Sequence, residues 1–294
     1  MEKSKKNAPP LQELNLADRF LFDEVMEDTD AHRDVLSIIL GRDISLLDDS
    51  ETEKEVRISS LARSIRLDVF AIDENQDVYD TEMQKVRKPD LAKRSRYYQG
   101  IIDTGILTPG IPNYKLLNNT YIILIMTFDP FGYEKYCYTF KPVCQEVPGY
   151  VLRDGATRIF LNTHGKNDDE VSAELVEFLH YVENSTDQTA QRSSSERVHR
   201  IHRRVQEVRQ NEKAGVKYML AWEEKYYERE EAREEGREEG RKKGREEGRE
   251  EGRETNTMES IRNLMETLKL SAEQAMAALK IPEEEQQKYF DMLK

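Results

Sequence analysis

The sequence predicts an α/β domain followed by an extended helical tail. Two observations indicate the α/β domain: a pattern typical of a β-hairpin within residues 65–84, and a continuous apolar run over residues 121–128. A third indicates the tail, because from residue 233 the chain repeats in charged tetrads that end in glycine. With 294 residues the chain can bury a real core, although its 35% of charged residues implies that part of it lies outside one.

Two helices are expected before the hairpin. The first spans residues 18–28, and its apolar side chains recur at helical spacing: Leu21, Phe22, Val25 and Met26. Asp30 is the expected N-cap of the second helix, which Gly41 ends. Both helices would cover the sheet with their apolar faces.

The segment 65–84 has the alternation of apolar and polar residues that is typical of paired strands. Residues 73–77, in its middle, are of the types that form turns. If Ile72 pairs with Val78 across this loop, the register of the whole hairpin is fixed.

That register places the carboxylates of Asp68 and Glu82 opposite each other, with their Cβ atoms about 5 Å apart. Gln84 shares their face because side chains alternate along a strand. Phe70 and Ile72 lie on this face too, which favours a half-buried functional pair over two solvated surface acids. Oxygen ligands of this kind suit Mg²⁺ or Mn²⁺, and such an ion can activate water against a phosphodiester.

A basic segment follows these acids, although the net charge of the chain is −13. Residues 85–96 contain one acidic residue, Asp90, and six basic residues: Lys85, Arg87, Lys88, Lys93, Arg94 and Arg96. Helical spacing from Leu91 onward leaves Lys93 and Arg96 outward. A solvated helix face is the alternative, but the position beside the acids favours contact with a DNA backbone. Lys93, Arg94 and Arg96 are therefore the predicted DNA-binding residues.

Further elements complete the predicted domain. Residues 121–128 read as a strand buried on both faces, and residues 136–140 and 157–161 as additional strands. A helix over 170–182 precedes a polar stretch, so we place the end of the domain, which begins near residue 10, at residue 185.

The remaining chain is predicted to be a charged helical linker over 186–256 and a small helical module over 257–294. Within the linker, the basic run 192–209 either touches nucleic acid or is a solvated helix face. Each glycine of the tetrads costs about 1 kcal/mol relative to alanine, so we expect a marginal helix or a flexible spacer. Alternatively, the glycines let two such helices approach in a homo-oligomer. In the last module, Ser271 and Gln274 have the spacing of a capping box.

Several segments together resemble the PD-(D/E)xK nuclease family transposases, a group also called recombination-promoting nucleases. The resemblance covers most of residues 10–185 and rests on DRFLF at 18–22, RLDV at 66–69, EMQ at 82–84, KRSRYYQ at 93–99, YIILIMTFDPFG at 121–132 and the segment 157–165. It implies a restriction-endonuclease-like fold, which is a mixed sheet flanked by helices, and cleavage of DNA with a divalent metal.

The resemblance also implies roles for individual residues. Asp68 and Glu82 match the two metal-binding acids, and Gln84 stands where the wider superfamily usually has a catalytic lysine. A neutral amide can orient a reactant through hydrogen bonds but lacks the charge of an ammonium group. Enzymes of this class often add an acid from the first helix, for which Glu24 is the candidate.

The expected function is that of a metal-dependent DNA endonuclease that promotes recombination or transposition. One alternative is a catalytically degenerate DNA-binding protein, in which Gln84 has abolished turnover. Another is a scaffold that assembles through the tail. Because the sequence has neither a membrane-spanning apolar run nor a signal peptide, we expect a cytoplasmic protein with no membrane partner.

Overall fold

The computed structural model describes residues 8–47, 51–56, 65–106 and 113–293, and for 51–56 and 65–67 it describes the backbone alone. The chain forms two compact units, Met1–Leu220 and Ala221–Lys294. Among the described helices, none combines the length and the apolar character that crossing a bilayer requires. Residues 1–7, where we expect no signal peptide, lie outside the described part.

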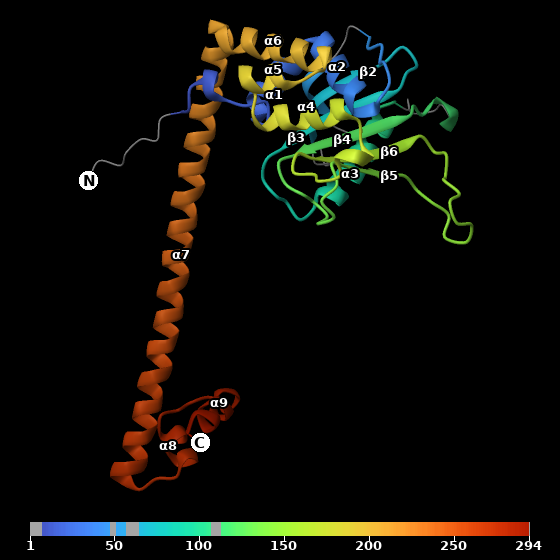
Figure 1. Ribbon diagram of the computed structural model, residues 1–294. Coiled ribbons are helices and arrows are strands. Elements are labelled where there is room, and N and C mark those ends of the chain that lie inside the picture. Colours follow the sequence, from blue (N-terminus) through green and yellow to red (C-terminus); the bar gives the residue numbers. More distant parts are fainter. Residues whose placement is uncertain (1–7, 48–50, 57–64, 107–112, 294) are drawn as a thin grey trace. The chain divides into compact units, whose positions relative to one another are not determined.

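The first unit contains a six-stranded sheet with the strand order β1-β2-β3-β4-β6-β5. Figure 1 labels β2 to β6 of this sheet. The strands are β1 (Glu51–Val56), β2 (Ile65–Ile72), β3 (Val78–Gln84), β4 (Thr120–Met126), β5 (Cys137–Phe140) and β6 (Ala156–Asn162). β3, β4 and β6 are parallel to one another, whereas β1, β2 and β5 join them in antiparallel pairs. The predicted mixed sheet is therefore confirmed.

Helices flank this sheet and divide its core in two. They are α1 (Arg19–Met26), α2 (Thr29–Leu40), α3 (Leu91–Ile106), α4 (Ala173–Glu183), α5 (Asp187–Arg192), α6 (Glu196–Gln210) and the start of α7 (Glu212–Leu268), with short 3-10 turns at Leu11–Glu13, Tyr114–Leu116 and Asp168–Glu170. α3 packs on Ile122 and Leu124 of β4. The helices α1, α2, α4 and α6 contribute to a larger core that contains Ile123 and Ile125, the residues of β4 that face the other way.

Two local details differ from the sequence prediction. Asp28, not Asp30, caps α2, because its carboxylate accepts a hydrogen bond from the Ala31 backbone nitrogen at 2.9 Å. Gly41 ends this helix in the left-handed region, with φ of 64°, as predicted.

The edge strand β1 was not predicted from the sequence. Its residues, ETEKEV, are polar at most positions, so they show no alternation of apolar and polar side chains that would indicate a strand.

The first compact unit continues past residue 185, where we placed the end of the predicted domain. The reason is the apolar face of α6, whose Val198, Ile201, Val205 and Val208 are buried in the larger core. The segment that contains this apolar face is mostly polar, so its mean hydropathy does not indicate a buried helix.

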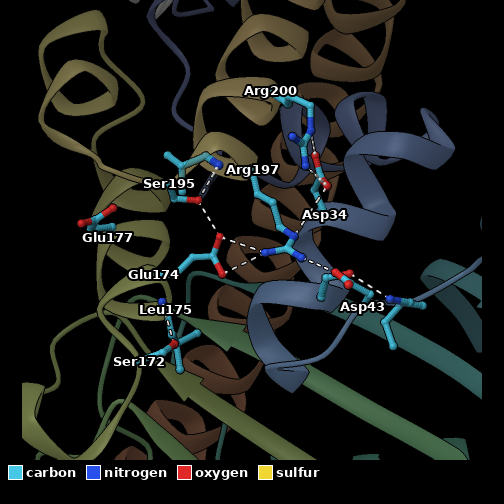
Figure 2. A network of polar contacts seen from close by, with 12 residues as sticks. Asp34, Asp43, Ser172, Glu174, Leu175, Glu177, Ser195, Arg197 and Arg200 are labelled. Atoms are coloured by element: carbon cyan, nitrogen blue, oxygen red, sulfur yellow. Dashed lines mark hydrogen bonds and ion pairs between the residues drawn. The ribbon is translucent and has the colours of Figure 1, made fainter.

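Arginines of the basic run 192–209 hold α6 against its neighbours. Arg200 donates from Nε and Nη2 to the two oxygens of Asp34 on α2, each at 2.7 Å, and Asp34 is 2% exposed. Arg197 pairs with Glu174 on α4 at 3.2 Å and also contacts Asp43 (Figure 2). These two arginines therefore serve packing within the unit.

We expect Asp34→Ala to lower the free energy of unfolding by about 1.5–3 kcal/mol, because two charge-assisted hydrogen bonds of a buried carboxylate are lost. Asp43→Ala is the matched control, since it removes an exposed partner of Arg197 and should cost less than about 1 kcal/mol. Urea unfolding of both variants measures the difference, and equal losses would show that α6 is not anchored through Asp34.

His32 on α2 is fully buried, and neither ring nitrogen has a hydrogen-bond partner among the described residues. Burial lowers the pKa of His32 to about 3, from 6.5 in an unfolded chain. Below pH 6.5, His32 becomes protonated in the unfolded state but stays neutral in the folded state. The free energy of unfolding therefore decreases as the pH falls below 6.5.

Removing this imidazole should weaken the acid sensitivity of the fold. Between pH 7 and pH 5.5 we expect the wild type to lose about 1 kcal/mol more unfolding free energy than His32→Leu. Urea titrations at the two pH values test this, and parallel losses in the two proteins would contradict it.

The second unit contains the rest of α7, α8 (Ala272–Ala278) and α9 (Glu283–Leu293). The tetrads are continuous helix, and around each of their glycines an added Cβ would meet nothing within 4 Å. A small core joins the end of α7 to the last two helices and contains Met258, Ile261, Ala275, Met276 and Tyr289. The predicted capping box of Ser271 and Gln274 is confirmed at the start of α8.

Candidate active site

The register of the β2–β3 hairpin is the predicted one. Ile72 pairs with Val78 and Val69 pairs with Thr81, so the next pair along the strands brings Asp68 opposite Glu82. The turn between the strands is closed by Asp73, whose carboxylate accepts hydrogen bonds from the backbone nitrogens of residues 75 and 77, each at 2.9 Å.

The face that carries the acids is buried. Asp68 is 3% exposed, Glu82 is 2% exposed and Gln84 is 8% exposed. The alternative of two solvated surface acids is therefore excluded, and the charges must be compensated within the protein.

Asp80 is a third buried acid on this face, which sequence reasoning missed. It lies two residues before Glu82 on β3, opposite Phe70 of β2 and Ile122 of β4. Neither of its carboxylate oxygens has a hydrogen-bond partner among the described residues. The period of two that places Gln84 beside Glu82 also places Asp80 there, so the signal was available in the sequence.

Two arginines supply the positive charge. Arg94 on α3 pairs through Nη2 with Oε2 of Glu82 at 2.5 Å. Arg19, the first residue of α1, pairs with Asp68 and also lies 3.5 Å from Asp23. Since α1 and α3 pack into the two different cores, the guanidinium groups reach the acids from helices on opposite sides of the sheet.

Burial and positive charge act in opposite directions on the acids. Burial raises the pKa of Asp68 and of Glu82, and the negative charge of Glu82 raises the pKa of Asp68 further. The positive charges of Arg19 and Arg94 lower both pKa values, which nevertheless remain raised. The pKa of Asp80 is raised well above its ordinary value, first by burial and then by the negative charges of Glu82 and Asp68. Such perturbed carboxyl groups are typical of functional sites.

The remaining predicted residues divide into two groups. Lys93 and Arg96 are exposed on α3, as the helical spacing predicts. Arg94, between them, is turned toward Glu82, and its guanidinium carbon lies 5.4 Å from the centre of the Tyr98 ring. It is therefore part of the acidic site, whereas its two neighbours form a basic outer face.

Glu24 is not brought to the acids by any contact of the described residues. Its carboxylate pairs with Lys217 at the start of α7, and Lys217 also lies 3.1 Å from Glu27. The residue of α1 that reaches the site is the basic Arg19 rather than an acid.

The donor set fits a divalent ion that takes few protein ligands. Among the described residues, no three histidine, cysteine or acidic side chains converge as a preformed metal cluster would. Mg²⁺ does not require one, because it binds through one or two carboxylates together with waters and substrate phosphate oxygens. The buried Oε1 of Glu82 has no hydrogen-bond partner among the described residues, so an acceptor is left over for a cation.

Comparison with known proteins places this arrangement in a family. Residues 20–235 match the family model described as PD-(D/E)XK nuclease family transposase. The chain belongs to this family. The match includes the whole hairpin with its acids, α3 and the helices up to α6. No curated protein and no solved structure matches the chain.

Membership of the PD-(D/E)XK family transposases confirms the resemblance seen in the sequence, and the mixed sheet flanked by helices is consistent with a restriction-endonuclease-like fold. It indicates a nuclease-type function, for which DNA is the expected substrate class. Nucleases of this superfamily typically use divalent metal ions, in agreement with the oxygen-rich donor set.

The buried carboxyl group of Asp80 should lower the free energy of unfolding. We expect Asp80→Val to raise the free energy of unfolding by about 1–3 kcal/mol, because a buried carboxyl group without a partner is replaced by an apolar side chain. Asp77→Val is the matched control: the Asp77 carboxylate accepts from Asn119 Nδ2 at 2.7 Å, so its loss should destabilise. Urea unfolding decides, and a destabilised Asp80→Val would mean that Asp80 has a partner after all.

Proposed function

We propose that this protein is a divalent-metal-dependent endonuclease that hydrolyses phosphodiester bonds in DNA, in the service of recombination or transposition. The observation that carries the proposal is the buried pair of Asp68 and Glu82, with one oxygen of Glu82 left unpaired among the described residues. Family membership supports the same reaction class.

In this proposal the side chains of Asp68 and Glu82 hold the ion, and Gln84 orients groups beside it by hydrogen bonding. When bound, the ion supplies polarisation of the phosphate and activation of water. Burial of the two carboxylates strengthens their attraction for a cation, because the site excludes solvent that would screen it. The raised pKa values of both acids follow from the same burial.

The exposed face of α3 is the proposed contact with the DNA backbone. Lys93 and Arg96 lie on it, on either side of Arg94, which itself touches the acids. A phosphate bound by Lys93 or Arg96 is therefore within one helical turn of Arg94, which pairs with Glu82. Positively charged side chains in this place compensate locally for a net charge of −13.

The test is nicking of supercoiled plasmid by the full-length protein with Mg²⁺, Mn²⁺ or EDTA. We expect nicking with either metal and none with EDTA. The isosteric variants Asp68→Asn and Glu82→Gln should slow it by about 100-fold or more, since each removes a charge that holds the ion. Asp169→Asn, at an exposed acid outside the site, is the matched control and should nick at the wild-type rate.

A second candidate function is a DNA-binding protein that no longer cleaves. It is favoured by Gln84, whose neutral amide donates from Nε2 to the Val86 carbonyl oxygen at 2.7 Å. Retained DNA binding in a gel shift, without nicking in any metal, would decide for this candidate and against the endonuclease.

A further inference from the structure

Gln84 is neutral, so a catalytic cation beside the acids would have to come from another residue, and Arg94 pairs with Glu82 there. We propose that Arg94 is this catalytic cation: one oxygen of Glu82 holds its guanidinium, and the other oxygen serves the metal ion. The inference rests on the proposed function, because it assigns a residue to the same reaction.

Gln84 cannot take this role itself. Its side chain is neutral, and one of its two N–H donors is used by the Val86 carbonyl oxygen, only two residues along the chain. A neutral donor stabilises developing negative charge less well than a cation does.

Arg94 lies between the buried acid and solvent. Its side chain is 20% exposed, whereas the side chain of Glu82 that it contacts is 2% exposed. The ring of Tyr98, one turn further along α3, lies close to the guanidinium and supports it from one side. A guanidinium has five N–H donors in a plane, so its contact with Glu82 leaves donors for phosphate oxygens.

Arg94 and Arg19 differ in their partners. The guanidinium of Arg94 pairs with Glu82, the acid that keeps an oxygen without a hydrogen-bond partner among the described residues. Arg19 divides its guanidinium between Asp68 and the buried Asp23 of its own helix. Arg94 is therefore the cation of the two that lies beside the free acceptor.

The two oxygens of Glu82 allow a metal ion and Arg94 to be bound at the same time. Oε2 accepts from Arg94, while Oε1 is buried and has no hydrogen-bond partner among the described residues. Arg94 would thus not need to leave Glu82 when an ion is bound, because a second oxygen of the carboxylate is available.

In the reaction, the oxygen of water forms a bond to phosphorus and the bond from phosphorus to one sugar oxygen breaks. The attacking water gives up one proton and the leaving sugar oxygen takes up one. The products are a strand end with a hydroxyl group and a strand end with a phosphate monoester, and one water is consumed. Negative charge grows on the non-bridging oxygens during this exchange, and Arg94 stabilises it there through its free N–H donors.

The experiment compares full-length wild type with Arg94→Met, Arg94→Lys and Arg96→Met. Single-turnover nicking in Mn²⁺ measures the rate, gel shifts in Ca²⁺ measure DNA affinity without cleavage, and calorimetry measures binding of Mn²⁺ alone. Arg94→Met should nick about 100-fold or more slowly while its DNA affinity stays within about threefold of wild type. Its Mn²⁺ affinity should be equal to wild type or higher, because a competing charge has been removed. Arg94→Lys should recover at least about tenfold of the lost rate.

Arg96→Met provides the contrast, because this exposed residue belongs to the outer face: it should weaken DNA binding. If Arg94→Met melts below the assay temperature, Arg94→Gln, which keeps a donor to Glu82 without the charge, takes its place under the same criteria.

Wild-type nicking by Arg94→Met overturns the inference and leaves the proposed function standing. A loss of nicking that follows an equal loss of Mn²⁺ binding also overturns it, since Arg94 would then only shape the ion site. Absence of nicking by the wild type refutes the proposed function, and the role of Arg94 falls with it.

Discussion

The structure depends on the burial of negative charge in the middle of a sheet. Asp68, Asp80 and Glu82 lie on one face of β2 and β3, each with 3% or less of its surface exposed. Like charges in such a place repel one another and lose their hydration, so the fold tolerates them only with compensation. Arg19 on α1 provides it for Asp68 and Arg94 on α3 provides it for Glu82, whereas neither oxygen of Asp80 has a hydrogen-bond partner among the described residues.

Most of this arrangement could be predicted from the sequence, because a hairpin register is a local property. The turn chemistry of residues 73–77 and the pair Ile72 and Val78 set the register, and the register alone brought Asp68 to Glu82. Asp80 follows from the same period of two, which places it on the face of Glu82 and Gln84. The arginines could not be assigned, because their partners lie on other elements and the contacts depend on tertiary packing.

The basic segment shows the limit of helical periodicity. The helical spacing of α3 correctly predicts that Lys93 and Arg96 are exposed. It does not predict where the side chain of Arg94 points, because Arg94 lies at the border between the buried and exposed faces. Its guanidinium is turned toward the sheet by the ion pair with Glu82, a contact that depends on tertiary packing. Similarly, the basic run 192–209 was ambiguous because charge counts do not show which arginines have buried partners such as Asp34.

α3 unites three tasks in one rigid element. Its Leu91, Ile101 and Ile102 are buried against the sheet, Lys93 and Arg96 face outward, and Arg94 touches Glu82. Packing of the apolar residues holds the helix, so a shift of its outer face would also move the guanidinium relative to the acids. In the proposed enzyme, binding of the DNA backbone and placement of the cation are thereby coupled mechanically. A lysine on β3 would lack this coupling, because its position would follow the strand rather than the helix that we propose contacts DNA.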